Sequence, residues 1–199
     1  LGLIKGSSGN LSLRLDKKRF LLTSSGCSLE CLQEKDIVTR SIDGQIISGK
    51  KPSSEWMIHR DLYKERSDIE SIVHTHSKYV CVLACLHKEL PPFHYMVAVA
   101  GGENIRCCPY ELFGTKKLSD NVIKAMRNRN ACLMANHGLV VGSSSLANSV
   151  YIAEEVESLC EQYVNALAIG NVKLLSQKQM KDVLEKFKNY GAIKEVGNE

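Results

Sequence analysis

The chain has 199 residues, of which 44% are hydrophobic and 24% charged, and a formal net charge of +4. These values are typical of a soluble globular protein, and no apolar stretch approaches the length of a membrane span. The lysines are scattered and form no concentrated basic stripe, which argues against a nucleic-acid partner; a small anionic substrate needs only a local site. Because we find no repeat, low-complexity tract or linker, we expect one domain over residues 1–199.

The first part of the chain carries the pattern of short strands. Residues 11–15 and 19–23 alternate apolar and polar side chains around a turn. Residues 37–42 and 45–48 flank Asp43-Gly44, a dipeptide typical of type I′ hairpin turns, because those turns need positive φ. The first part therefore predicts two hairpins.

Helices and strands alternate in the rest of the chain. We expect a helix that Ser53 caps and that runs to about Glu65, and a long amphipathic helix over residues 146–167. Ser176-Gln177-Lys178-Gln179 has the form of a capping box before a last helix that Gly191 ends. The remaining predictions are strands at 69–76 and 131–142 and helices at 78–86 and 119–129. Together these elements predict an α/β protein with helical layers around a largely antiparallel sheet.

Two histidines, His74 and His76, end the apolar run that starts at residue 69. In a strand, residues i and i+2 point to the same face, so both imidazoles can bind one metal ion. The pair alone is a weak signal. His137 strengthens it, because it too follows an apolar run, at residues 131–135. Three histidine ligands leave a coordination position for water or substrate, which is typical of a catalytic site.

Eight cysteines are many for this length, yet no two have the C-x-x-C spacing of a zinc or redox motif. Most lie in apolar segments, and the N-terminus has no signal-peptide pattern. We therefore expect free thiols in the reducing cytoplasm rather than a disulfide framework.

Three short segments offer hydroxyl groups and accessible backbone N–H groups to an anion: Ser7-Ser8-Gly9-Asn10, Thr23-Ser24-Ser25-Gly26 and Ser53-Ser54. The last also lies at an expected helix N-terminus, where unpaired donors favour phosphate. Each segment alone is equally compatible with a plain turn or cap. Glu55 follows directly, and it either complements the helix dipole or acts as a general base beside a metal and a phosphate.

Taken together, the motifs resemble the class II aldolase/adducin family over nearly the whole chain. The matching segments are Gly6-Ser7-Ser8-Gly9-Asn10-Leu11-Ser12, Lys51-Pro52-Ser53-Ser54-Glu55-Trp56, Val73-His74-Thr75-His76, His94-Tyr95-Met96 with Ala100-Gly101-Gly102, Pro109-Tyr110-Glu111-Leu112-Phe113-Gly114-Thr115, Asn136-His137-Gly138-Leu139 and Glu185-Lys186-Phe187-Lys188-Asn189-Tyr190-Gly191. The family's first helix has no counterpart, and Leu1-Gly2-Leu3 resembles the end of an element already under way, so we expect that helix to be missing.

The resemblance implies a three-layer α/β/α fold and a metal-dependent aldolase, usually with zinc, whose ligands are His74, His76, His137 and, without substrate, Glu55. It implies cleavage of L-fuculose 1-phosphate, or a close ketose 1-phosphate, to dihydroxyacetone phosphate and L-lactaldehyde. In that reaction the metal stabilises an enediolate and Glu55 is the acid/base. The phosphate would be bound by Ser7, Gly9, Asn10, Ser25, Gly26, Ser53 and Ser54.

The remaining implied residues lie on the aldehyde side of the substrate. Tyr95 is similar to a tyrosine that reaches a neighbouring subunit's site in a homotetramer, and Phe113, Phe187 and Tyr190 would contact the aldehyde. Each of these aromatics taken alone is more typical of packing. Two alternatives remain: a sugar-phosphate 4-epimerase of the ribulose-5-phosphate type, which Glu55 disfavours, and a non-catalytic adducin-like module, which the three histidines disfavour.

Overall fold

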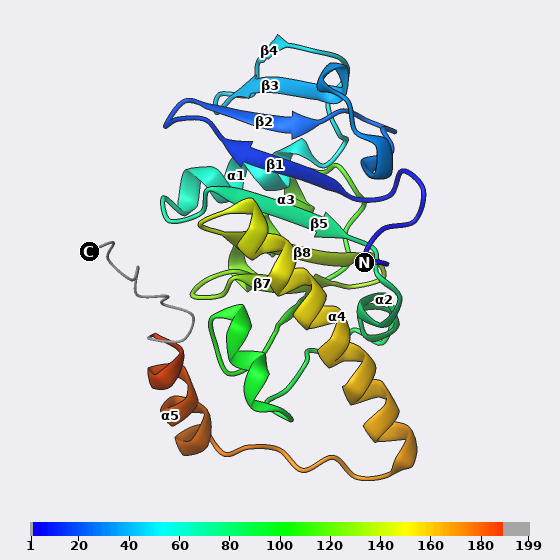
Figure 1. Cartoon of the computed structure of the whole chain (residues 1–199), viewed down its shortest axis with the longest axis vertical. Helices are drawn as coiled ribbons and strands as arrows, with labels where there is room; N and C mark the ends of the chain where they lie inside the picture. Colours follow the sequence, from blue (N-terminus) through cyan, green and yellow to red (C-terminus); the bar gives the residue numbers. More distant parts are fainter. Residues whose placement is uncertain (1, 189–199) are drawn as a thin grey trace, which may run out of the picture.

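The structure, a computed structural model, describes residues 2–188 and contains one eight-stranded sheet of order β4-β3-β2-β1-β5-β8-β7-β6 (Figure 1). The strands are β1 (Asn10–Arg14), β2 (Arg19–Thr23), β3 (Ile37–Ser41), β4 (Ile46–Ser48), β5 (Ser71–Thr75), β6 (Cys107–Cys108), β7 (Ala131–Met134) and β8 (Gly138–Ser143). Every neighbouring pair is antiparallel except β6 and β7. The prediction of a largely antiparallel sheet is therefore confirmed.

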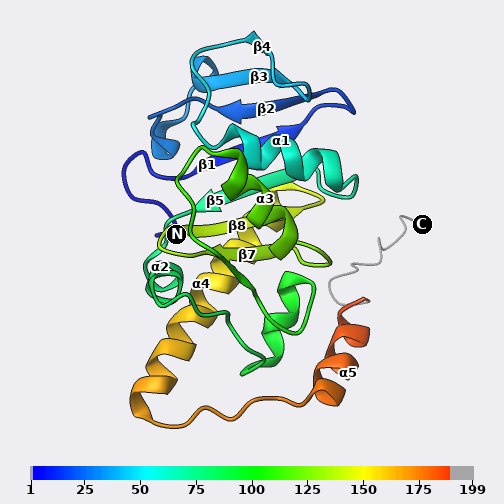
Figure 2. The same cartoon turned by 180° about the vertical axis from the view of Figure 1, so that it is seen from behind.

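Helices pack against both faces of this sheet. They are α1 (Trp56–Glu65), α2 (Lys78–Cys85), α3 (Lys116–Ala125), α4 (Leu146–Ile169) and α5 (Gln177–Phe187), with short 3₁₀ segments that include η3 (Tyr95–Ala100). Ile72 and Val73 are neighbours on β5 and belong to two different core clusters. The Ile72 cluster includes side chains of α1 and α3, and the Val73 cluster includes side chains of α2 and α4. Figure 1 shows α4 in front of the sheet, and Figure 2 shows α1 and α3 on the opposite face.

Several predicted elements differ from the structure at their ends. The single strand expected over residues 131–142 is two strands, β7 and β8, that pair antiparallel. They are joined by a turn in which Asn136 has φ +53°. The hairpin at Asp43-Gly44 forms, but only Gly44 has positive φ, so the turn is not type I′. Its loop spans three residues, because Ser41 N donates to Gln45 O.

Two helices begin elsewhere than predicted. The prediction that Ser53 caps α1 is wrong: the N-cap is Glu55, and the Ser53 hydroxyl accepts from Glu55 N at 3.3 Å. The helix α3 begins at Lys116 rather than at residue 119, because the Thr115 hydroxyl accepts from Leu118 N and caps it. The capping box at Ser176 and the long helix α4 are confirmed, whereas the helix end expected at Gly191 lies outside the described residues.

All eight cysteines are free, as expected, although only Cys108, Cys132 and Cys160 are buried. Among the helices that the structure describes, none combines the length and the apolar character that crossing a membrane requires.

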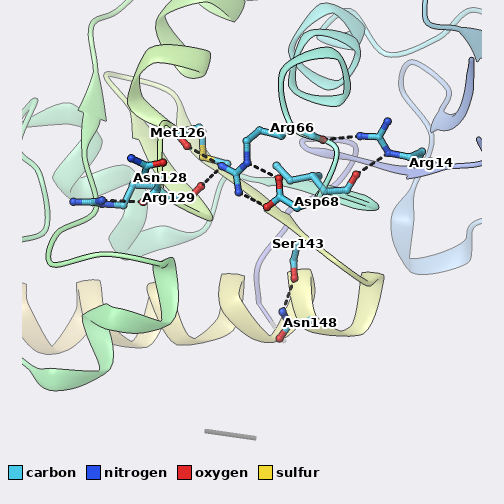
Figure 3. Close-up of polar contacts among 9 residues, drawn as sticks. Arg14, Arg66, Asp68, Met126, Asn128, Arg129, Ser143 and Asn148 are labelled. Atoms are coloured by element: carbon cyan, nitrogen blue, oxygen red, sulfur yellow. Dashed lines mark hydrogen bonds and ion pairs between the residues drawn. The ribbon is translucent and has the colours of Figure 1, made fainter. Parts of the chain in front are cut away.

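An arginine network joins the segment between α1 and β5 to the turn before β7 (Figure 3). The Arg66 guanidinium donates to Met126 O and Arg129 O, at 3.0 and 2.9 Å, and binds both carboxylate oxygens of Asp68 at 2.7 Å. Arg14 in turn donates to Arg66 O at 2.7 Å. These bonds satisfy backbone carbonyls where α3 ends and tie that end of α3 to the segment between α1 and β5.

We expect Arg66→Ala to lower the free energy of unfolding by about 1–3 kcal/mol, because two partly buried carbonyl groups lose their donor. Urea denaturation measures this change. Arg127→Ala is the matched control, since Arg127 is an exposed arginine near the same turn. Equal stability of the two variants would show that the network does not hold α3 in place.

Candidate metal centre

Four side chains from three separate parts of the chain meet where the central strand β5 ends and β8 begins: Glu55, His74, His76 and His137. His74 lies on β5 and His76 follows the end of that strand. His137 lies in the turn between β7 and β8, and β8 pairs with β5 so that Thr75 is opposite Leu139. This register brings His137 beside the end of β5. Glu55 enters from the N-cap of α1.

The four side chains each direct one ligand atom to a common point. His74 Nε2 lies 2.7 Å from Glu55 Oε2 and 2.8 Å from His76 Nε2, and His137 Nε2 lies 3.4 Å from Glu55 Oε2. The four ligand atoms are all within 4.8 Å of one another. The structure thus brings together all four residues that the sequence predicts around a metal ion.

The donor set fits a cation. His74 Nδ1 donates to Leu139 O at 2.8 Å, so in the neutral ring His74 Nε2 carries a lone pair rather than a proton. That lone pair faces both a carboxylate oxygen and another ring nitrogen at hydrogen-bond distance. In addition, Glu55 Oε1 is buried and has no hydrogen-bond partner among the described residues. Such converging lone pairs repel unless a positive charge lies between them.

The electrostatics of the cluster favour the ligand forms of these groups. Burial raises the pKa of the Glu55 carboxyl, but positive charge on the His74 and His137 rings, with their hydrogen bonds, outweighs burial and holds the pKa well below its usual range. A cation held by the neutral rings would supply positive charge at the same place. Burial, together with repulsion by His74 and His137, lowers the pKa of His76 to about 4. At neutral pH the cluster therefore offers a carboxylate and a neutral imidazole, the forms that bind a metal ion.

Gly138 permits β8 to pass close to His76. A Cβ atom at Gly138 would overlap Thr75 O and lie 3.0 Å from His76 Cδ2. We therefore expect Gly138→Ala to displace the His76 ring and to lower metal affinity by about 10- to 100-fold. Titration of the metal-free protein with Zn²⁺ measures this. Gly142→Ala is the control, because its Cβ would meet the flexible Ile69 side chain instead; an equal loss in both variants would indicate a general effect of strand β8.

The metal cluster lies in a pocket of about 540 Å³ that all three predicted anion-binding segments also line. The lining residues are Ser7, Ser8, Gly9, Asn10, Ser24, Ser25, Gly26, Ser53, Ser54, Glu55, His74, His76, Tyr110, Glu111, Phe113, Asn136 and His137. Gly9 lies against β5, the strand that carries His74. It has φ +92°, and a Cβ atom there would be 2.6 Å from His74 O. The other two segments are tied together, since Ser53 N donates to Thr23 O at 3.1 Å.

No lysine or arginine is among these lining residues. Any anion in the pocket would therefore be held by hydroxyl groups, amide and backbone N–H groups and the N-terminus of α1, together with a bound cation.

Of the aromatic residues predicted on the aldehyde side of the substrate, the structure places only Phe113 in the pocket among the residues that it describes. Phe113 lines the pocket and is 61% exposed. Tyr95, on η3, is 48% exposed and does not line it, and neither does Phe187 at the end of α5. Tyr190 lies outside the described residues.

The sequence interpretation missed two lining residues near Phe113. Tyr110 is 54% exposed, and Glu111 forms an ion pair with Lys117 at 2.6 Å. Both lie in the motif that carries Phe113, so membership of that motif was the signal available for them.

A family model described as "Class II Aldolase and Adducin N-terminal domain" matches residues 1–164. The chain is 46% identical to the 5-methylthioribulose-1-phosphate/5-deoxyribulose-1-phosphate aldolase of Rhodospirillum rubrum, over 96% of this chain and 86% of that protein. It is 41% identical to the L-fuculose phosphate aldolase of Escherichia coli, over 96% of this chain and 89% of that protein.

A solved structure of an L-fuculose 1-phosphate aldolase superimposes with a TM-score of 0.90. The match is 42% identical and covers 94% of this chain and 88% of that chain. The similarity therefore extends over nearly the whole chain.

Proposed function

Because the chain belongs to the family of class II aldolases and adducin N-terminal domains, and is a class II aldolase, we propose that it cleaves a ketose 1-phosphate between C3 and C4. The products are dihydroxyacetone phosphate and a short aldehyde; with L-fuculose 1-phosphate the aldehyde is L-lactaldehyde. The observation that supports this best is a Glu/His₃ cluster in one pocket with three hydroxyl- and glycine-containing segments.

We further propose that residues 1–199 act as one domain of three-layer α/β/α architecture.

The family is metal-dependent, and in this chain His74, His76 and His137 would hold the ion, with Glu55 as a fourth ligand in the absence of substrate. When bound there, the ion, which we propose is Zn²⁺, would polarise the ketose carbonyl and would stabilise the negative charge that develops on oxygen during bond cleavage. Imidazole nitrogen is a preferred ligand of zinc, and three histidines leave room for substrate oxygen atoms.

The serine- and glycine-containing segments would bind the phosphate group. The residues are Ser7, Gly9, Asn10, Ser25, Gly26, Ser53 and Ser54, all of which line the pocket. Ser53 and Ser54 directly precede the N-cap of α1, where unpaired backbone N–H groups and the helix dipole favour an anion. Phosphate binding at this end would place the substrate carbonyl toward the histidine cluster.

Glu55 would transfer the proton at carbon. In the cleavage direction, the C4 hydroxyl loses its proton as the C3–C4 bond breaks, and the electron pair stays on the dihydroxyacetone fragment. The released proton would pass to the Glu55 carboxylate, and Glu55 would give it to C3, so that no net proton is gained or lost. In the synthetic direction, the Glu55 carboxylate removes that proton. The depressed pKa of Glu55 supports the carboxylate role at neutral pH. Glu55 is 5% exposed, so bulk water does not compete with it for the proton.

Tyr95 would act on the aldehyde oxygen of a neighbouring subunit's site in a homotetramer. Tyr95 is exposed and does not line its own chain's pocket, which supports this arrangement, since an interface residue is exposed on a single chain. Phe113, Phe187 and Tyr190 would contact the aldehyde carbon chain.

If sites are shared between subunits, mixing Tyr95→Phe subunits with Glu55→Gln subunits is expected to restore activity. A site that takes Glu55 from a Tyr95→Phe subunit and Tyr95 from a neighbouring Glu55→Gln subunit has both residues intact. Each variant alone, unfolded and refolded in the same way, is the control. A mixture no more active than its components would contradict the shared site.

The substrate is tested with three ketose 1-phosphates: L-fuculose 1-phosphate and the two substrates in the name of the R. rubrum relative. We expect dihydroxyacetone phosphate and aldehyde in equal amounts from at least one of them. Ribulose 5-phosphate is assayed in parallel for exchange between isomers. Exchange between isomers without release of dihydroxyacetone phosphate would identify the protein as a 4-epimerase and not as an aldolase.

A further inference from the structure

Four buried side chains form a hydrogen-bonded chain directly behind the pocket. Asn10 and Ser12 lie two residues apart on β1 and so share a face, and His59 and Tyr63 lie four apart on α1 and so share a side. The Tyr63 hydroxyl is 2.7 Å from Ser12 Oγ, which is 2.6 Å from His59 Nδ1. His59 Nε2 bonds to Asn10 Oδ1. All four residues are at most 4% exposed, so water does not compete for these bonds.

The hydrogen bonds in this chain all run from donor to acceptor in one direction, from Tyr63 through Ser12 and His59 to Asn10. Asn10 Oδ1 can only accept, so His59 Nε2 carries the proton that it donates. Burial, with a smaller contribution from His74, lowers the pKa of His59 to about 3, so the ring is neutral and Nδ1 accepts from the Ser12 hydroxyl. Burial raises the pKa of Tyr63, which keeps its proton and donates it to Ser12 Oγ. The reverse direction would leave the Tyr63 proton without an acceptor within residues 2–188.

This direction determines which end of the Asn10 amide faces the pocket. Its oxygen is bound to His59, whereas its nitrogen has no hydrogen-bond partner among the described residues and is not a buried atom. Asn10 lines the pocket, so the amide N–H groups face it. Among residues 2–188, no lysine or arginine lines this pocket, so anion affinity depends on the orientation of neutral donors. A reversed amide would present an oxygen atom to the anion and repel it.

We infer that His59 is a positioning residue that holds the Asn10 amide N–H groups toward the phosphate group of the substrate, an inference that rests on the proposed function. His59 itself does not line the pocket, so it would act on the substrate only through Asn10. Ser12 and Tyr63 support this positioning, because their hydrogen bonds fix which nitrogen of the His59 ring carries the proton.

The test measures binding of glycerol 3-phosphate to the metal-free protein by calorimetry, which separates phosphate binding from metal chemistry. His59→Leu removes the donor to Asn10, and we expect a loss of about tenfold in affinity, the size of one hydrogen bond to a charged group. His59→Gln keeps an N–H group near the position of Nε2 and is expected to restore most of it. With metal and substrate, KM of His59→Leu should rise while kcat is retained.

A double-mutant cycle separates positioning from a general structural effect. In an Asn10→Ala background, His59→Leu should change affinity by less than about twofold, because the amide that it orients is gone. If His59→Leu does not fold, Tyr63→Phe replaces it in the cycle as a milder change that removes one hydroxyl. Tyr63→Phe should lower the affinity for glycerol 3-phosphate when Asn10 is present and change it by less than about twofold in the Asn10→Ala background. Equal losses in both backgrounds would overturn the role of His59. If the unsubstituted protein does not bind glycerol 3-phosphate, the phosphate assignment itself fails, and the inference fails with it.

Discussion

Glu55→Gln is expected to lower kcat for aldehyde release by about 10²- to 10⁴-fold, the contribution of a positioned acid/base group. Glutamine has nearly the same shape but cannot take a proton from C3 or return it. Metal content should stay near that of the unsubstituted protein, because the three histidines remain. The two measurements, initial rate and metal per chain, therefore separate a lost proton transfer from a lost metal ion.

Glu65→Gln is the matched control, since Glu65 is exposed at the other end of the same helix. It should change neither rate nor metal content. Substantial residual turnover by Glu55→Gln would remove Glu55 from the proton-transfer role. A large loss of metal in that variant would instead make Glu55 mainly a ligand, which its 2.7 Å contact with His74 Nε2 also permits.

His137→Ala is expected to lower bound metal and activity together. His137 Nε2 lies 3.4 Å from Glu55 Oε2, and it is the one ligand that the turn between β7 and β8 supplies. Its loss leaves His74 and His76, which lie two residues apart at the end of β5, with Glu55 as the other ligand of the cluster, so the ion loses one of its three imidazole ligands. Elemental analysis of the purified variant gives the metal content, and added Zn²⁺ should restore activity only at concentrations far above those of the unsubstituted protein.

His94→Ala controls for the loss of any histidine, because His94 lies outside the cluster and accepts from Met96 N. Its metal content should not change. Full metal occupancy in His137→Ala would show that another residue completes the ligand set.

The sequence predicts those parts of the site that rest on short-range periodicity. The spacing of His74 and His76 places both on one face of a strand, and His137 follows a second apolar run, so the three rings could be expected together. The hairpin of β3 and β4 and the helix α4 follow equally directly from alternation and helical spacing. These features need no knowledge of which strands are neighbours.

Other features depend on tertiary contacts that no local pattern records. The sequence predicts one strand over residues 131–142, whereas the structure has a turn at Asn136 that depends on a left-handed backbone and on a Gly138 that packs against Thr75. The start of α1 at Trp56 leaves Ser53, Ser54 and Glu55 outside the helix and directs them into the pocket.

His59 shows the same limit for single side chains. On the sequence it is one histidine in an amphipathic helix, and nothing local distinguishes it from a solvent-exposed residue. Its role depends on Asn10 and Ser12, which lie 49 and 47 residues away along the chain. Only the packing of α1 against β1 brings these partners together.

The central claim is that one divalent metal ion is bound by the three imidazoles beside Glu55. An anomalous-scattering map from crystals of the zinc-loaded protein, recorded at the zinc absorption edge, tests it most directly. We predict one peak per chain, about 2.0–2.1 Å from the Nε2 atoms of His74, His76 and His137. A peak at the cysteines, or none at this cluster after loading, would contradict the account.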